Sequence, residues 1–131
     1  MTRREQREQV FLMLFGAEFH AAEEFEEHLK RYEETAADWD ARDGRYLMDK
    51  CSRIVEQLED IDMAINGAVQ GWKTKRMGKV DLALIRLAVY EMRYDDTIPV
   101  GVAINEAVEL AKKYGTEDSP SFVNGVLARL V

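Results

Sequence analysis

The stretch that most constrains this chain is residues 80–94, VDLALIRLAVYEMRY. On a helix, at about 100° per residue, its apolar side chains point to almost every side. Its charged side chains occupy only narrow strips between the apolar ones. With Lys79, the residue before this stretch, Arg86 and Arg93 form one thin basic line at heptad spacing. A helix this apolar is not a surface helix, and the segment is too short and too charged to cross a bilayer. We therefore expect a central helix around which the other helices pack.

Length and composition favour a soluble helical protein. A chain of 131 residues has room for one domain with a real core. Its two prolines and eight glycines leave little material for a turn-rich β fold. The single cysteine, Cys51, excludes an internal disulfide and fits a reducing compartment, where we expect it to be a small core residue. No apolar run follows the first arginines, so we expect no signal peptide, no membrane anchor and a cytoplasmic location.

The remaining helices follow from apolar periodicity and from start and stop signals, and no segment alternates as a strand would. A capping box at Thr2 and Glu5 opens the first helix, which should run to about Phe19. Asp60 or Asp62 should cap the fourth helix. The other helices are expected near residues 22–32, 44–58, 99–114 and 119–130. The fold class is therefore all-α, with about seven helices.

Catalytic and metal-binding motifs are missing from the sequence. It contains no Gly-rich phosphate loop, no paired Cys or Cys/His spacing and no nucleophile motif. Helical di-iron proteins use Glu-x-x-His, but the residues three before His20 and His28 are Ala17 and Phe25. We therefore expect no metal, no cofactor and no enzymatic activity, which leaves binding as the function.

The chain has a net charge of −7, yet its charges are unevenly distributed. Acidic residues concentrate between residues 18 and 43, whereas Arg3, Arg4 and Arg7 lie on the first two turns of the first helix. Cations at a helix N-terminus oppose the helix dipole, which indicates that they serve a partner. A frayed, solvated terminus is the equally weighted alternative.

A second basic cluster occupies residues 71–79, GWKTKRMGK. Trp72 stands there among Lys73, Lys75, Arg76 and Lys79, and this composition is used to stack a splayed base while neutralising its phosphates. The alternative is that Trp72 caps the core. We expect the two basic clusters to form one RNA-binding surface.

The C-terminal third carries PVGVAINEAVELAKKYGTEDSPSFVNGVL, and this run closely resembles the signature of the NusB family of bacterial transcription antitermination factors. The segments VDLALIRLAVYEM and RREQREQVF are also similar to that family, so the resemblance covers essentially the whole chain. It implies one domain over residues 1–131, with two small helical subdomains at about 1–72 and 79–131. It also implies a non-enzymatic role: binding boxA RNA of ribosomal RNA transcripts with NusE, a small-subunit ribosomal protein, in the RNA polymerase antitermination complex.

The resemblance also implies site residues. The basic arm of the family falls on Arg3, Arg4 and Arg7, interrupted here by Glu5 and Gln6. The RNA-facing turn falls on Asp118, Ser119 and Phe122, and the NusE-facing surface on Phe15 and Asp81. Because this turn starts a helix, it presents free backbone N–H groups to a phosphate. Phe122 is expected either to stack on a base or to pack in the core. The assignment of Trp72, Lys73 and Lys75 to RNA comes from composition alone.

Two alternatives come from other protein classes. A NusB-like domain also forms the N-terminal RNA-binding part of certain ribosomal RNA cytosine methyltransferases, which we expect to continue into an α/β domain, whereas this sequence ends at Val131. The other alternative is a bundle that binds only proteins, with its basic clusters far apart. Asn105 and Glu106 are expected to form buried hydrogen bonds between the lobes. The sequence leaves monomer and homodimer open.

Overall fold

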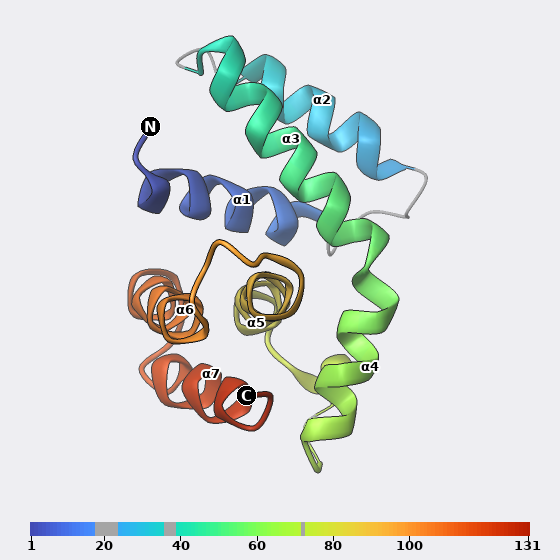
Figure 1. The fold of residues 1–131 in the computed structure, drawn as a ribbon. Helices are drawn as coiled ribbons and strands as arrows, with labels where there is room; N and C mark the ends of the chain where they lie inside the picture. The colour runs from blue at the N-terminus through green and yellow to red at the C-terminus, as the bar shows by residue number, and fades with distance from the viewer. Residues whose placement is uncertain (18–23, 36–38, 72) are drawn as a thin grey trace. The chain divides into compact units, whose positions relative to one another are not determined.

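The computed structural model describes residues 1–17, 24–35, 39–71 and 73–131. These residues form seven α-helices, one short 3₁₀ helix and no strand, which confirms the all-α prediction. None of the described helices is long and apolar enough to cross a membrane. The elements are α1 (Arg3–Ala17), α2 (Phe25–Thr35), α3 (Ala41–Glu56), α4 (Leu58–Ala68), η2 (Thr74–Arg76), α5 (Lys79–Tyr94), α6 (Val100–Tyr114) and α7 (Ser119–Ala128) (Figure 1).

The chain divides into two compact units, Met1–Val55 and Glu56–Val131. The division falls earlier than the expected end of the N-terminal lobe near residue 72. The reason is that α4 packs against α5 and η2, so it belongs with the C-terminal helices. The first unit therefore holds α1, α2 and nearly all of α3, and the second holds α4 to α7.

In the first unit, α1 begins as the sequence predicts. The backbone N–H of Thr2 donates to Glu5 Oε1 at 2.9 Å, and the N–H of Glu5 donates to Thr2 Oγ1 at 3.1 Å. This reciprocal pair is the capping box, which satisfies two of the amides that a helix start leaves without partners. The helix is described as far as Ala17, so the expected end at Phe19 lies outside the described residues.

Side chains from α1 connect to both other helices of the first unit. Tyr32 on α2 donates its hydroxyl to Gln9 Oε1 at 3.1 Å, and the Cys51 thiol on α3 lies 3.8 Å from the Met13 sulfur. Cys51 is fully buried, as expected for a small core residue. The buried apolar side chains of this unit are those of Val10, Phe11, Met13, Leu14, Phe25, Leu29, Leu47, Cys51 and Ile54.

In the second unit, α5 is the central helix, and it contacts α4, α6 and α7 (Figure 1). Nine of its sixteen residues are buried, which confirms the prediction that a helix with apolar side chains on almost every side is central. The helix begins at Lys79, one residue before the apolar run, with Gly78 at its N-cap. Two expectations for this unit are wrong. Asn105 is exposed. Gln57 occupies the N-cap of α4, and Asp62 instead forms an ion pair with Arg86 of α5.

Candidate nucleic-acid interface

The predicted arginine arm begins on a turn that is held in place. The N-terminal ammonium of Met1 lies 3.3 Å from Asp43 Oδ2, and Gln6 Nε2 donates to Asp43 Oδ1 at 3.1 Å. The pKa of the Glu5 carboxyl is lowered by two hydrogen bonds from Thr2, of which the one from the backbone has the larger effect and the one from the side chain the smaller. The first turn is therefore capped at its start and tied to α3. Arg3 and Arg4 are both exposed on this turn.

Arg7 does not share that exposure, although the predicted basic arm groups it with Arg3 and Arg4. Only 8% of its surface is accessible. The reason lies in the helical period: Arg7 shares a face with Val10, Phe11 and Leu14 at positions i, i+3, i+4 and i+7, and these three residues are buried. The exposed basic arm therefore consists of Arg3 and Arg4.

Phe15, predicted to face a protein partner, lies in the last turns of α1 and is half-buried. Its ring centroid lies 6.2 Å from that of Phe11, with the planes tilted by 38°. The Phe11 side chain is buried, so the Phe15 ring lies beside an aromatic neighbour that is fixed in place. Part of the Phe15 ring remains accessible for a contact.

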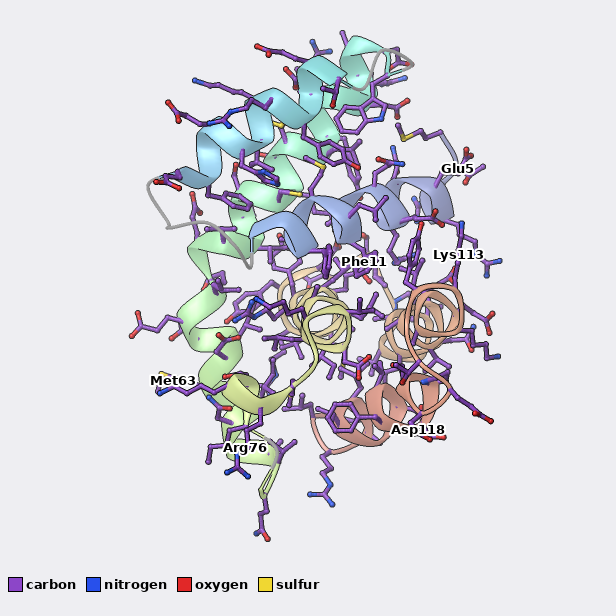
Figure 2. The ribbon with its side chains drawn as sticks, turned by 180° about the vertical axis from the view of Figure 1, so that it is seen from behind. Glu5, Phe11, Met63, Arg76, Lys113 and Asp118 are labelled. Atoms are coloured by element: carbon purple, nitrogen blue, oxygen red, sulfur yellow. The ribbon has the colours of Figure 1, made fainter. Side chains whose placement is uncertain are left out.

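The second basic cluster forms an exposed loop in the second unit. We call Lys73, Lys75, Arg76 and Lys79 the basic segment, and all four are exposed (Arg76 in Figure 2). Asn66, in the last turns of α4, holds its start: the Asn66 carbonyl accepts from Lys73 Nζ at 3.2 Å, and Asn66 Oδ1 accepts from the Thr74 backbone at 2.8 Å. Trp72 lies outside the described residues.

The turn between α6 and α7 is built around Ser119. Its side chain is buried, and its hydroxyl accepts a hydrogen bond from the Thr116 backbone at 2.9 Å. A Cβ at Gly115 would collide with the Ser119 side chain, which explains the glycine at the end of α6. Asp118 (labelled in Figure 2) is the N-cap residue of α7, but its carboxylate makes no capping hydrogen bond. Asp118 is exposed, whereas Ser119 is almost completely buried.

Phe122 is half-buried and lines two hollows on the second unit. The first, of about 270 Å³, we call the acidic hollow; its lining residues are Met77, Gly78, Asp81, Asp118 and Phe122. Asp81 Oδ1 is buried there and has no hydrogen-bond partner among the described residues. This hollow brings together Asp81, predicted to face a protein, with Asp118 and Phe122, predicted to face RNA.

The second hollow, of about 220 Å³, lies between the end of α4 and α7. We call it the Gly125 hollow; its lining residues are Val69, Gln70, Ser121, Phe122, Gly125, Val126 and Arg129. Arg129 Nη1 donates to the carbonyl of Ala68 at 3.4 Å. Gln70, Gly125 and Arg129 are not among the predicted site residues. The sequence carries one signal for them, namely that Arg129 is the only charged residue in residues 119–131.

The predicted site residues fall in both units. Arg3, Arg4, Arg7 and Phe15 lie in the first, and the basic segment, Asp81 and the turn before α7 lie in the second. Within the described ranges, no three His, Cys, Asp or Glu side chains lie close enough together to hold a metal ion. His20 lies outside these ranges.

Comparison with known proteins gives one consistent result. The family model described as "NusB family" matches residues 4–131. A transcription antitermination protein NusB from Agathobacter rectalis is 50% identical over 129 residues, which cover 98% of each chain. A NusB structure from T. maritima superposes with a TM-score of 0.89 at 37% identity, covering 99% of this chain and 90% of that one. A crystal structure of antitermination factors NusB and NusE in complex with double-stranded RNA superposes at 0.77 and 26% identity, covering 99% and 97%.

Proposed function

The chain belongs to the NusB family, and from this premise we propose that it binds boxA RNA of ribosomal RNA transcripts together with NusE. In this role it acts as a transcription antitermination factor in the cytoplasm, within the RNA polymerase antitermination complex. Its contribution is binding, not catalysis.

The observation that carries the RNA part of this proposal is the setting of Phe122. Its ring lines two hollows, and it belongs to the same unit as the basic segment. The chain as a whole is acidic, so phosphates would be repelled from most of its surface and attracted to these few lysines and arginines. Met77 and Gly78, which line one of these hollows with Phe122, lie in the sequence between Arg76 and Lys79. A partly exposed aromatic ring combined with such charges is the arrangement that stacks an unpaired base.

The protein partner is supported by Asp81 and Phe15. A buried carboxylate oxygen without a hydrogen-bond donor is costly, and a donor from a bound partner removes that cost. Phe15 offers a partly exposed aromatic ring of the kind enriched at protein interfaces. The crystal structure of NusB and NusE with RNA, which resembles this chain over 99% of its length, supports NusE as that partner.

The experiment is a titration of fluorescently labelled boxA RNA with the full chain, with and without purified NusE, followed by anisotropy. A scrambled RNA of the same length and composition is the control. We expect boxA to bind more tightly than the scrambled RNA, and NusE to tighten boxA binding further. Equal affinity for the two RNAs with NusE present would refute the proposal.

Asp81→Asn and Phe15→Ala separate the two partners. Both variants should weaken the effect of NusE, while binding of RNA to the chain alone should change little. If both variants respond to NusE as the parent does, NusE binds another surface.

A further inference from the structure

We propose that the Gly125 hollow is a subsite for one unpaired nucleotide of the bound RNA, with its base against Phe122 and its phosphate near Arg129. This inference rests on the proposed function and deepens it, because it adds Gln70, Gly125 and Arg129, which were not among the predicted site residues, to Phe122, which was. The site lies wholly within the second unit, Glu56–Val131.

A glycine forms part of the wall of this hollow. Gly125 lies in the middle of α7, where glycine is unfavourable compared with alanine. The fold gives no reason for it: its φ is not positive, and a Cβ built there would meet no atom within 4 Å. The missing side chain therefore leaves space at the wall of the hollow, and a ligand that approaches the helix closely would use that space.

The walls of the hollow combine apolar surface with polar groups. Phe122 and Val126 supply apolar surface from α7, and Val69 supplies it from the end of α4. The Gln70 amide and the Ser121 hydroxyl are exposed at the same hollow, and both groups can donate and accept hydrogen bonds. An aromatic face combined with a few such polar groups suits the stacking of a base and the recognition of its edge.

Charge also favours RNA in this hollow. None of the described residues that line it is Asp or Glu, although the whole chain has a net charge of −7. Arg129 is the charged residue among them. Arg129 uses one N–H for a long hydrogen bond to Ala68, and a guanidinium has five such donors, so others are available for a phosphate.

The acidic hollow on the other side of Phe122 makes the contrast clear. It presents Asp81 and Asp118, whose charges repel a phosphate. A side chain from a protein partner would suit that hollow better, whereas the acid-free walls of the Gly125 hollow suit RNA. The local charge therefore favours a nucleotide over an aromatic protein side chain as the occupant of the Gly125 hollow.

The test compares the parent with Gly125→Leu, which fills the hollow. Gly101→Leu is the matched control, because Gly101 is also an exposed helical glycine with open space around it, on α6 and outside both hollows. We expect Gly125→Leu to weaken boxA binding by roughly 5- to 150-fold, the loss of one stacked base, while Gly101→Leu binds as the parent does. Gly125→Ala should give a smaller loss, and thermal melts confirm that each variant is folded.

A set of boxA RNAs in which one base at a time is removed adds a second measurement. For the parent, removal of the base that occupies this subsite should lower the affinity for RNA more than removal of other bases. For Gly125→Leu, removal of the same base should leave the affinity almost unchanged, because the filled hollow no longer holds that base. If folded Gly125→Leu binds RNA as tightly as the parent, the subsite is refuted. Loss of NusE binding with RNA binding intact would also refute it, in favour of a protein side chain. If the parent itself does not distinguish boxA from scrambled RNA, the proposed function fails and the subsite fails with it.

Discussion

Arg86 of α5 and Asp62 of α4 form a two-pronged ion pair in the second unit. Arg86 Nε donates to Asp62 Oδ1 at 2.9 Å, and Arg86 Nη2 donates to Asp62 Oδ2 at 2.7 Å. The exposed fractions of the two side chains are 15% and 25%, so water screens the pair only partly. Paired in this planar way, the charges fix both the distance and the rotation of α4 relative to α5.

We predict that Asp62→Asn and Arg86→Lys each lower the free energy of unfolding by roughly 1–3 kcal/mol, because each breaks the two-pronged geometry and leaves its partner half-satisfied. Urea unfolding measures this. The control is Arg53→Lys, since Arg53 and Asp49 form an exposed pair, with exposed fractions of 65% and 61%, whose loss should cost about 0–0.5 kcal/mol. If the variants at both pairs lose the same free energy of unfolding, the ion pair between α4 and α5 stabilises the fold no more than an exposed pair does.

The two arginines Arg4 and Arg7 should behave differently. Arg4→Ala removes an exposed side chain and should leave the melting temperature nearly unchanged while weakening RNA binding. Arg7→Ala removes a buried side chain and should lower the melting temperature by several degrees, roughly as a 1–3 kcal/mol loss would. Leu84→Ala, in the centre of α5, sets the scale at roughly 2–5 kcal/mol. Arg7→Ala melting like the parent would show that its burial has no energetic consequence.

Because of Cys51, we expect the free energy of unfolding to depend on pH above pH 9. Burial raises the pKa of its thiol from 9.0 to about 12. Above pH 9 the unfolded thiol loses its proton while the folded thiol keeps it, so stability falls as pH rises towards 12, by at most about 1.4 kcal/mol per pH unit. Below pH 9 both states keep the proton, and the contribution is constant. Urea unfolding of the parent and of Cys51→Ala at pH 8, 9 and 10 should show a difference that shrinks with pH; a constant difference would contradict the assignment.

Asp118 faces the proposed RNA as an exposed negative charge, and its carboxylate makes no capping hydrogen bond. Asp118→Asn should therefore leave the melting temperature unchanged. It should tighten RNA binding at low salt by up to about five-fold, because it removes one repulsive charge near a phosphate, and the gain should shrink as salt increases. Equal affinities of Asp118→Asn and the parent at low salt would place the RNA away from this turn.

The sequence predicts the helices well because their signals are local. Residues 80–94 carry apolar side chains on almost every side of the helix, so the helix must be buried whichever elements pack against it. The observed α5 begins one residue before that stretch. The Thr2 and Glu5 side chains act within one turn, so the capping box is visible in the sequence. The burial of Arg7 also follows from a local pattern, since Val10, Phe11 and Leu14 share its face of the helix. Its charge, which groups it with Arg3 and Arg4, pointed the other way.

The parts that the sequence did not predict depend on contacts between distant segments. Asp62 looks like a helix cap until α4 lies against α5 and brings it to Arg86. The Gly125 hollow exists because α7 meets the end of α4, about 50 residues earlier in the chain, and no local pattern specifies that meeting. Ser119 and Asp118 are neighbours with opposite exposure, which only the geometry of the turn decides.

We propose that RNA binding depends on a few exposed bases that contact the phosphates of single-stranded RNA, although the chain as a whole is acidic. The affinity for boxA RNA, measured across a range of salt concentrations, tests this dependence. With about five phosphate contacts, the logarithm of the binding constant should fall with the logarithm of salt concentration with a slope of roughly −3.5. A slope near zero would contradict the claim, because RNA bound without phosphate contacts does not need Arg3, Arg4, Arg129 or the basic segment.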